Sequence, residues 1–151
     1  MEKFTSINDI LEFAINQEQK AVDFYLKLSA ISTNAEMKII FEDFAKEEVQ
    51  HKAKLLNIKE SNEFTIPTEK ISSLNIADYV VKPNIDENIT YEDALKIAMA
   101  REKASFKLYS RLAEEAENPY YADLFRMLAQ EEAKHKLRFE IEYDDIVLKN
   151  N

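Results

Sequence analysis

The stretch Glu48-Val49-Gln50-His51 occurs again as Glu132-Ala133-Lys134-His135, and this repeated motif decides how the chain folds. In each copy a carboxylate and an imidazole stand three residues apart, a spacing that places both side chains on one face of a helix. One glutamate lies 30 positions before each copy, Glu18 before the first and Glu102 before the second. Both histidines of the chain therefore belong to one recurring pattern with four glutamates.

The two halves of the chain repeat each other around these motifs. An offset of 84 positions aligns Tyr25 with Tyr109 and Phe41 with Phe125, and no gap is needed. A duplicated helical hairpin can dock against its own copy with approximate two-fold symmetry. We therefore expect the glutamates and histidines of both halves to converge on one place.

The composition favours an all-α fold in a single domain that spans residues 1–151. The chain has no glycine and only three prolines, so it has little material for the tight turns that sheets need. Hydrophobic residues make up 46% of the 151 residues and charged residues 32%, which is enough apolar material for one sizeable core.

Four helices can be placed from capping residues and apolar spacing. The first begins after Ser6 and ends at the polar turn 32–34, and the second spans about 35–57. The third begins after Thr90, which resembles a capping box with the acidic residue three positions on, and the fourth begins at Pro119. Each helix has an apolar stripe, and in the third helix this stripe includes Phe106.

The glutamates of the repeated pattern interrupt these apolar stripes. Glu18 occupies a core position between Ala14 and Ala21, and this bundle-seam spacing points it toward the other helices. The helix segments from Glu18 to the turn and from the turn to Glu48 are similar in length, about 22 Å each for the rise of an α-helix. Antiparallel pairing therefore brings the two glutamates to the same height.

Residues 59–88 form the expected connector between the two hairpins. Their periodicity is broken, they contain Pro67 and Pro83, and they allow one short helical piece at 73–80. A connector of this length is too long for a hairpin turn and suits a crossover that runs along the bundle. Apolar residues such as Ile66 and Leu74 favour a packed crossover over a flexible linker.

The charge balance and residue usage exclude several classes of partner. With 29 acidic and 20 basic residues the net charge is −9, which argues against nucleic acid and anionic membranes. The absence of cysteine excludes disulfides, thiolate metal sites and iron–sulfur clusters. No apolar run approaches the roughly 18 residues of a membrane span, and the first residues lack the apolar core of a signal peptide. We expect a cytoplasmic protein with no membrane or nucleic-acid partner.

Four carboxylates facing one another in a bundle core require neutralisation. Each would cost several kcal/mol to desolvate, and their mutual repulsion would add to that cost. Two divalent cations would balance the charges of Glu18, Glu48, Glu102 and Glu132 and leave the histidines as neutral nitrogen ligands. This donor set suits iron or manganese, allows zinc and disfavours calcium. A buried salt-bridge network is the alternative.

The six-residue pattern resembles the di-iron motif of the ferritin-like superfamily. Its members here are Glu18, Glu48, His51, Glu102, Glu132 and His135. The glutamate-rich second and fourth helices and the tyrosines seven residues after Glu18 and Glu102 are most similar to rubrerythrin-like proteins. The resemblance covers nearly the whole chain. It implies a ferritin-like antiparallel four-helix bundle, made of two repeated helical hairpins joined by a long crossover, and a centre of two iron ions.

The resemblance also implies roles for these residues. Glu48 and Glu132 would bridge the two metals. The remaining ligands would be Glu18 with His51 for one metal and Glu102 with His135 for the other.

Two further features of the resemblance concern electron transfer and hydrogen bonding. Tyr25 and Tyr109 would donate hydrogen bonds to the bridging carboxylates. Rubrerythrins proper have a further glutamate on the third helix, where Met99 and Ser105 flank Glu102 here, and a cysteine-rich rubredoxin module, which this sequence lacks. The ligand exchange and the internal electron relay of that family are therefore not expected.

The expected function is that of a rubrerythrin-like peroxidase. It would reduce hydrogen peroxide, or react with dioxygen, at two iron ions, with manganese or zinc also possible. Electrons would come from an external donor such as a rubredoxin-type protein, and a homodimer is expected. Two other functions stay open: a ferroxidase that handles iron as ferritins do, and a non-catalytic bundle held together by zinc or by no metal.

Overall fold

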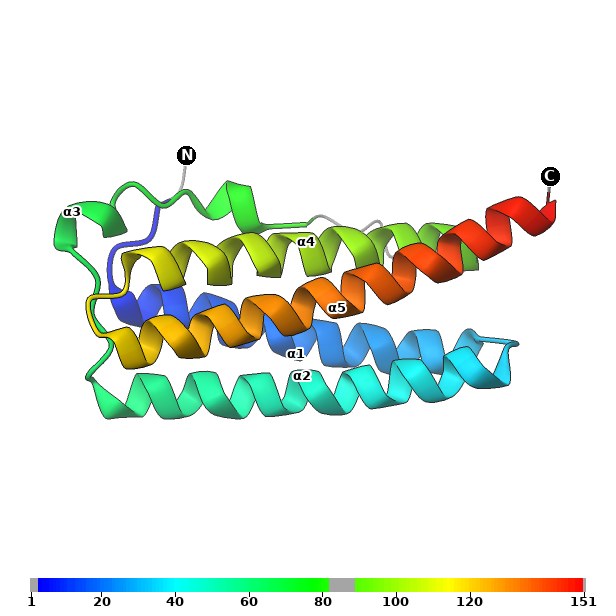
Figure 1. Ribbon diagram of the computed structural model, residues 1–151, viewed down its shortest axis with the longest axis horizontal. Helices are drawn as coiled ribbons and strands as arrows, with labels where there is room; N and C mark the ends of the chain where they lie inside the picture. Colours follow the sequence, from blue (N-terminus) through cyan, green and yellow to red (C-terminus); the bar gives the residue numbers. More distant parts are fainter. Residues whose placement is uncertain (1–2, 82–88, 151) are drawn as a thin grey trace.

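The computed structural model describes residues 3–81 and 89–150 and contains two helical hairpins in one four-helix bundle (Figure 1). The helices are α1 (Ile7–Ile31), α2 (Ala35–Ser61), α4 (Tyr91–Glu115) and α5 (Pro119–Asn150). Helix α1 pairs with α2, and α4 pairs with α5. The predicted all-α antiparallel bundle of two repeated hairpins is confirmed.

The helix starts follow from capping side chains. Ser6 Oγ accepts a hydrogen bond from the backbone N–H of Asp9 at 3.1 Å, and Thr90 Oγ1 accepts one from Asp93 at the same distance. Both predicted caps are therefore confirmed, since each satisfies an N–H that the first helical turn leaves without a partner. Helix α2 extends four residues beyond its predicted end and stops at Asn62, whose φ of 57° is left-handed. Asparagine tolerates this conformation better than most residues and takes the place of the glycine that usually ends a helix.

The buried side chains form two apolar clusters, one on each side of a polar layer. In α1, Ala14 belongs to the first cluster and Ala21 to the second, with Glu18 between them. In α5, Ala129 and Phe139 likewise belong to different clusters and enclose the second motif. Apolar side chains therefore separate the glutamates and histidines from the water at either end of the bundle.

The crossover packs against the bundle, as predicted, but its local structure differs from the prediction. Its described part contains α3 (Thr68–Ile71) and a 3₁₀ turn, η1 (Ile76–Tyr79), in place of one helical piece at 73–80. The backbone N–H of Leu74 donates a hydrogen bond to the carbonyl oxygen of Ile71. The turn that this bond closes separates the two short helical segments. Ile66 and Leu74 are buried, and η1 lies beside α4 (Figure 1). Residues 82–88, also predicted as crossover, lie outside the described residues.

One residue of the predicted apolar stripes is misplaced. Phe106 is 40% exposed, although the pattern put it in the core of the third helix. The buried face of α4 continues from Glu102 to Tyr109 and Leu112. At helical spacing Ser105 lies closer to this face than Phe106 does. No helix in the described part of the chain has both the length and the apolar composition that crossing a bilayer demands.

Candidate metal centre

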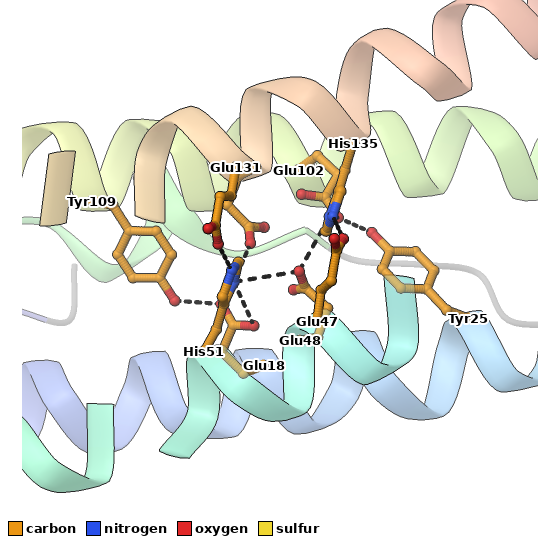
Figure 2. Close-up of polar contacts among 10 residues, drawn as sticks. Glu18, Tyr25, Glu47, Glu48, His51, Glu102, Tyr109, Glu131 and His135 are labelled. Carbon is orange, nitrogen blue, oxygen red and sulfur yellow. Dashed lines mark hydrogen bonds and ion pairs between the residues drawn. The ribbon is translucent and has the colours of Figure 1, made fainter. Parts of the chain in front are cut away.

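All four helices of the bundle contribute to one polar layer (Figure 2). Helices α1 and α4 each provide one glutamate, and α2 and α5 each provide a glutamate and a histidine one helical turn apart. The six side chains are Glu18, Glu48, His51, Glu102, Glu132 and His135, each between 1% and 3% exposed. The structure therefore brings together all six residues of the repeated sequence pattern.

These side chains form two overlapping groups of possible metal ligands. One group consists of Glu18, Glu48, His51 and Glu132, and the other consists of Glu48, Glu102, Glu132 and His135. Within each group, one donor atom from every residue lies within 4.8 Å of the others. Glu48 and Glu132 belong to both groups. Two cations, one in each group, would therefore share these two carboxylates.

The contacts inside the layer connect the two hairpins. His51 Nδ1 lies 2.7 Å from an oxygen of Glu132 and 3.4 Å from one of Glu48. His135 Nδ1 lies 3.2 Å from the same Glu48 oxygen and 3.5 Å from Glu102. Each imidazole thus faces a shared carboxylate on the opposite hairpin. The layer is a junction between the halves of the repeat.

The inner donor atoms of all six residues lack hydrogen-bond partners among the described residues. They are Glu18 Oε2, Glu48 Oε1, His51 Nδ1, Glu102 Oε2, Glu132 Oε1 and His135 Nδ1. Buried polar atoms are rarely left without a partner, because each costs about 1–3 kcal/mol in that state. One unpaired atom on every residue, all within the layer, is the donor set that two cations would satisfy. The residues therefore fit a two-metal site.

The comparison with known protein families agrees with this geometry. The Rubrerythrin family profile matches residues 9–143. The chain belongs to the rubrerythrin family. No curated protein sequence matches it.

Two solved structures share the fold of this rubrerythrin family member. A candidate ferritin-like diiron-carboxylate protein from Thermotoga maritima has a TM-score of 0.78 and 23% identity, over 95% of this chain and 98% of that one. A hypothetical protein from Pyrococcus furiosus has a TM-score of 0.71 and 22% identity, over 92% of this chain and 89% of its own. At these identities the likeness establishes the four-helix fold.

The outer nitrogens of both histidines are held by two glutamates that the sequence analysis missed. His51 donates from Nε2 to Glu131, and His135 donates from Nε2 to Glu47 (Figure 2). Each bond again joins α2 to α5. Because Nε2 carries the donated proton, the lone pair of a neutral ring lies on Nδ1, which faces the layer. The sequence signal for these two residues is a glutamate directly before each motif. Glu47 and Glu131 are equivalent positions of the repeat, 84 residues apart.

Removing one of these outer glutamates should weaken metal binding without abolishing it. For Glu131→Ala we expect about a 10- to 100-fold loss of affinity at the metal that His51 would bind, since His51 then has no partner to orient it. Metal-binding titrations followed by calorimetry would measure this loss. Gln50→Ala, on the exposed side of α2, is a control that should bind like the wild type. Equal affinities for all three proteins would contradict a role for Glu131.

Both predicted tyrosines contact the cluster, but at different carboxylates from those expected. Tyr25 donates to Glu102 and Tyr109 donates to Glu18, so each hydroxyl bridges α1 and α4 (Figure 2). The prediction that they bond to Glu48 and Glu132 is therefore wrong. Antiparallel docking places each tyrosine next to the lone glutamate of the other half. Burial raises the pKa of both tyrosines well above 10, and nearby carboxylates raise it further, so both remain donors.

Tyr25→Phe should keep the metals and change the reaction rate. The substitution removes one hydrogen bond to Glu102 but no candidate ligand. We expect unchanged metal content and a loss of about 1–3 kcal/mol in the free energy of unfolding, because a buried carboxylate oxygen loses its donor. Elemental analysis, thermal unfolding and single-turnover kinetics would check this. Loss of metal from this variant would show that Tyr25 is needed to build the site.

The protonation of the layer depends on burial and on charge crowding. Burial raises the pKa of Glu48 and Glu132 well above the usual carboxyl value, and the neighbouring glutamates raise it further. Burial also acts on His135 to lower its pKa, but Glu102 and Glu48 outweigh this effect and raise it to about 11. His51 shifts upward for the same reason, through Glu18 and Glu131. In the metal-free protein these groups therefore hold protons that a cation would have to displace.

Proposed function

We propose that this chain is a non-haem di-iron oxidoreductase that reduces hydrogen peroxide. One observation supports this most strongly: two groups of buried donors share Glu48 and Glu132, and the inner atom of each donor lacks a hydrogen-bond partner among the described residues. Membership of the rubrerythrin family and the name given to the Thermotoga maritima protein support iron as the metal. Manganese and zinc are the alternatives.

The residues have distinct proposed roles. Glu48 and Glu132 would hold both ions, because only these two belong to both groups. The residues that would hold one ion each are Glu18 with His51 and Glu102 with His135. Each ion would then have two terminal ligands and two shared ones, a count that leaves coordination positions for an oxidant.

The protein surroundings would control the reaction by excluding water and fixing the donors. Bound iron supplies the redox chemistry by cycling between its ferrous and ferric states. Reduction of one peroxide molecule consumes two electrons and two protons and yields two water molecules. The apolar clusters on both sides of the layer keep it dry. The tyrosine hydroxyls hold Glu18 and Glu102 in place while the charge of the centre changes.

We propose that the electrons come from outside the chain. Its 151 residues include no cysteine, so it contains neither a rubredoxin-type iron site nor a thiol that could relay electrons. We propose a separate electron-transfer protein of rubredoxin type as the donor, and a homodimer as the oligomeric state.

A rapid-mixing experiment tests the proposed function. The iron-loaded protein is reduced without oxygen and then mixed with hydrogen peroxide or with dioxygen, and oxidation of the centre is followed by its absorption. We expect oxidation by peroxide to be the faster reaction. A faster reaction with dioxygen, or a centre that oxidises added ferrous iron in a many-chain particle, would favour the iron-handling alternative. Stoichiometric zinc in protein purified without added metal would favour a structural role.

A further inference from the structure

A small cavity lies beside the carboxylate cluster, where α1, α4 and the crossover meet. Its volume is about 10 Å³, which leaves room for no more than a molecule of one or two heavy atoms. Glu102 and Glu132 form part of its wall. Both have an inner oxygen with no hydrogen-bond partner in the described residues. The cavity is therefore a narrow approach to the polar layer.

The internal repeat relates several residues of the cavity wall to one another. Gln17 and Arg101 line it and are equivalent positions of the repeat, 84 residues apart, and the same holds for Ala21 and Ser105. These pairs come from α1 and α4, so the cavity lies where the two hairpins meet. Its cluster carboxylates belong to the second half, because Glu102 and Glu132 line it and their equivalents Glu18 and Glu48 do not. The pairs also differ in chemistry, because Arg101 is a cation and Gln17 an amide.

Arg101 gives the cavity a positive side with an unused donor. Its guanidinium packs over the Phe24 ring, 5.1 Å from the ring centre, which fixes the side chain. Its Nε is buried and has no hydrogen-bond partner within residues 3–81 and 89–150. Gln17 and Ser105, which carry an amide and a hydroxyl, also line the cavity. The lining therefore combines hydrogen-bond donors for an oxygen-containing molecule with carboxylates.

The crossover restricts what can enter. Tyr79 and Val81 of the crossover form part of the cavity wall, and Tyr79 is itself only 9% exposed. A molecule of one or two heavy atoms fits such a space, whereas an organic substrate does not. The positive charge of Arg101 also disfavours this route for metal cations.

We propose that this cavity binds hydrogen peroxide beside the cluster and that Arg101 is the residue that holds it there. The inference rests on the proposed function, because it names how the substrate of that centre is bound. Both oxygens of peroxide accept hydrogen bonds, and both O–H groups can donate to a carboxylate. The cavity matches this pattern with a guanidinium and glutamates in its lining.

Fluoride is a suitable probe, because it is an anion of about the size of water. The iron-loaded, reduced protein is titrated with fluoride by calorimetry without oxygen, since ferric iron would itself bind fluoride, and iodide serves as a control that is too large for the cavity. For Arg101→Gln, which copies the amide of Gln17, we expect fluoride to bind ~10-fold or more weakly, since hydrogen bonds to charged groups are among the stronger ones. The half-saturating peroxide concentration should rise by a similar factor. Arg101→Lys should retain most of the binding.

Two further variants separate charge from shape. Lys103→Gln removes the same charge two positions away, at an exposed site, and should bind fluoride as the wild type does. Ser105→Leu fills the cavity without changing charge and should abolish fluoride binding while iron content stays the same.

The outcomes distinguish this inference from the proposed function. If the wild type never binds a pair of iron ions, the proposed function fails and the inference with it. If the pair binds, but Arg101→Gln and Ser105→Leu take up fluoride like the wild type, only the role of the cavity is overturned. If Arg101→Gln does not fold, Ser105→Leu, compared with the wild type, decides the question, because it fills the cavity and leaves Arg101 in place.

Discussion

Replacement of Glu48 by alanine should leave the protein unable to retain either metal ion. Glu48 belongs to both donor groups, so its removal takes one ligand from each ion and leaves fewer carboxylate charges to balance two cations. We expect the same of Glu132→Ala. Elemental analysis after exhaustive dialysis should give a metal content near zero for both variants, against two ions per wild-type chain.

These variants should still fold, which makes the result interpretable. In the metal-free protein burial and the neighbouring carboxylates disfavour an ionised Glu48, so its removal reduces the electrostatic cost of the buried layer. Glu48→Gln keeps the side-chain volume and serves as a second test. Glu60→Ala makes the same change at an exposed position of α2 and should retain two metals. Retention of two ions by the Glu48 or Glu132 variants would contradict the shared-ligand assignment.

Metal binding should strengthen steeply as the pH rises, and the metal-free protein should become less stable over the same range. Glu48 and Glu132 have a folded pKa well above their ordinary value of 4.5, so they are protonated when no cation is bound. Metal ions bind the deprotonated form, and each proton displaced makes the apparent affinity rise about tenfold per pH unit. Metal titrations at several pH values, with proton release measured in weakly buffered solution, would determine the number of protons.

The sign of the stability change follows from the same shifts. For groups whose pKa is raised on folding, the stabilising contribution is complete below the unfolded pKa and is lost as the pH rises through the folded one. Glu48, Glu132 and His135 are such groups, and the pKa of His135 is raised from 6.5 to about 11. Glu102 shifts in the opposite direction, because Glu132 and His135 outweigh its burial and lower its pKa; it affects stability only in acid.

We therefore expect the unfolding temperatures of the metal-loaded and metal-free proteins to diverge between pH 5 and pH 9. Differential scanning calorimetry would measure both curves. Metal-free protein that gains stability as the pH rises across this window would show that the buried carboxyls are not protonated, and the electrostatic account of the layer would be wrong.

The fold and the six clustered residues could be predicted from the sequence because the chain is an internal repeat. Glu18 alone in an apolar stripe has many explanations. The offset of 84 that relates it to Glu102 also relates the two Glu-x-x-His motifs, and helical periodicity puts all of them on inward faces. Helix caps such as Ser6 could also be predicted, since each depends only on a few neighbouring residues.

What the sequence did not predict depends on how the hairpins dock. The bonds of Tyr25 to Glu102 and of His51 to Glu131 each join residues about half a chain length apart. Which of these residues meet depends on how each helix is rotated against its partner, and the residue pattern of one helix does not specify that rotation. Phe106 was misplaced because a step of three or four residues from Glu102 fits the stripe almost equally well. The cavity beside Arg101 depends on where the crossover lies, which composition does not specify.

The most direct test of the account is the metal content of the protein together with its effect on stability. Protein purified without added metal is analysed for iron, manganese and zinc, and its thermal unfolding is compared before and after treatment with a chelator. The account predicts two metal ions per chain and a markedly lower unfolding temperature once they are removed. Equal unfolding temperatures, with no metal pair found in either sample or after iron is added, would contradict it.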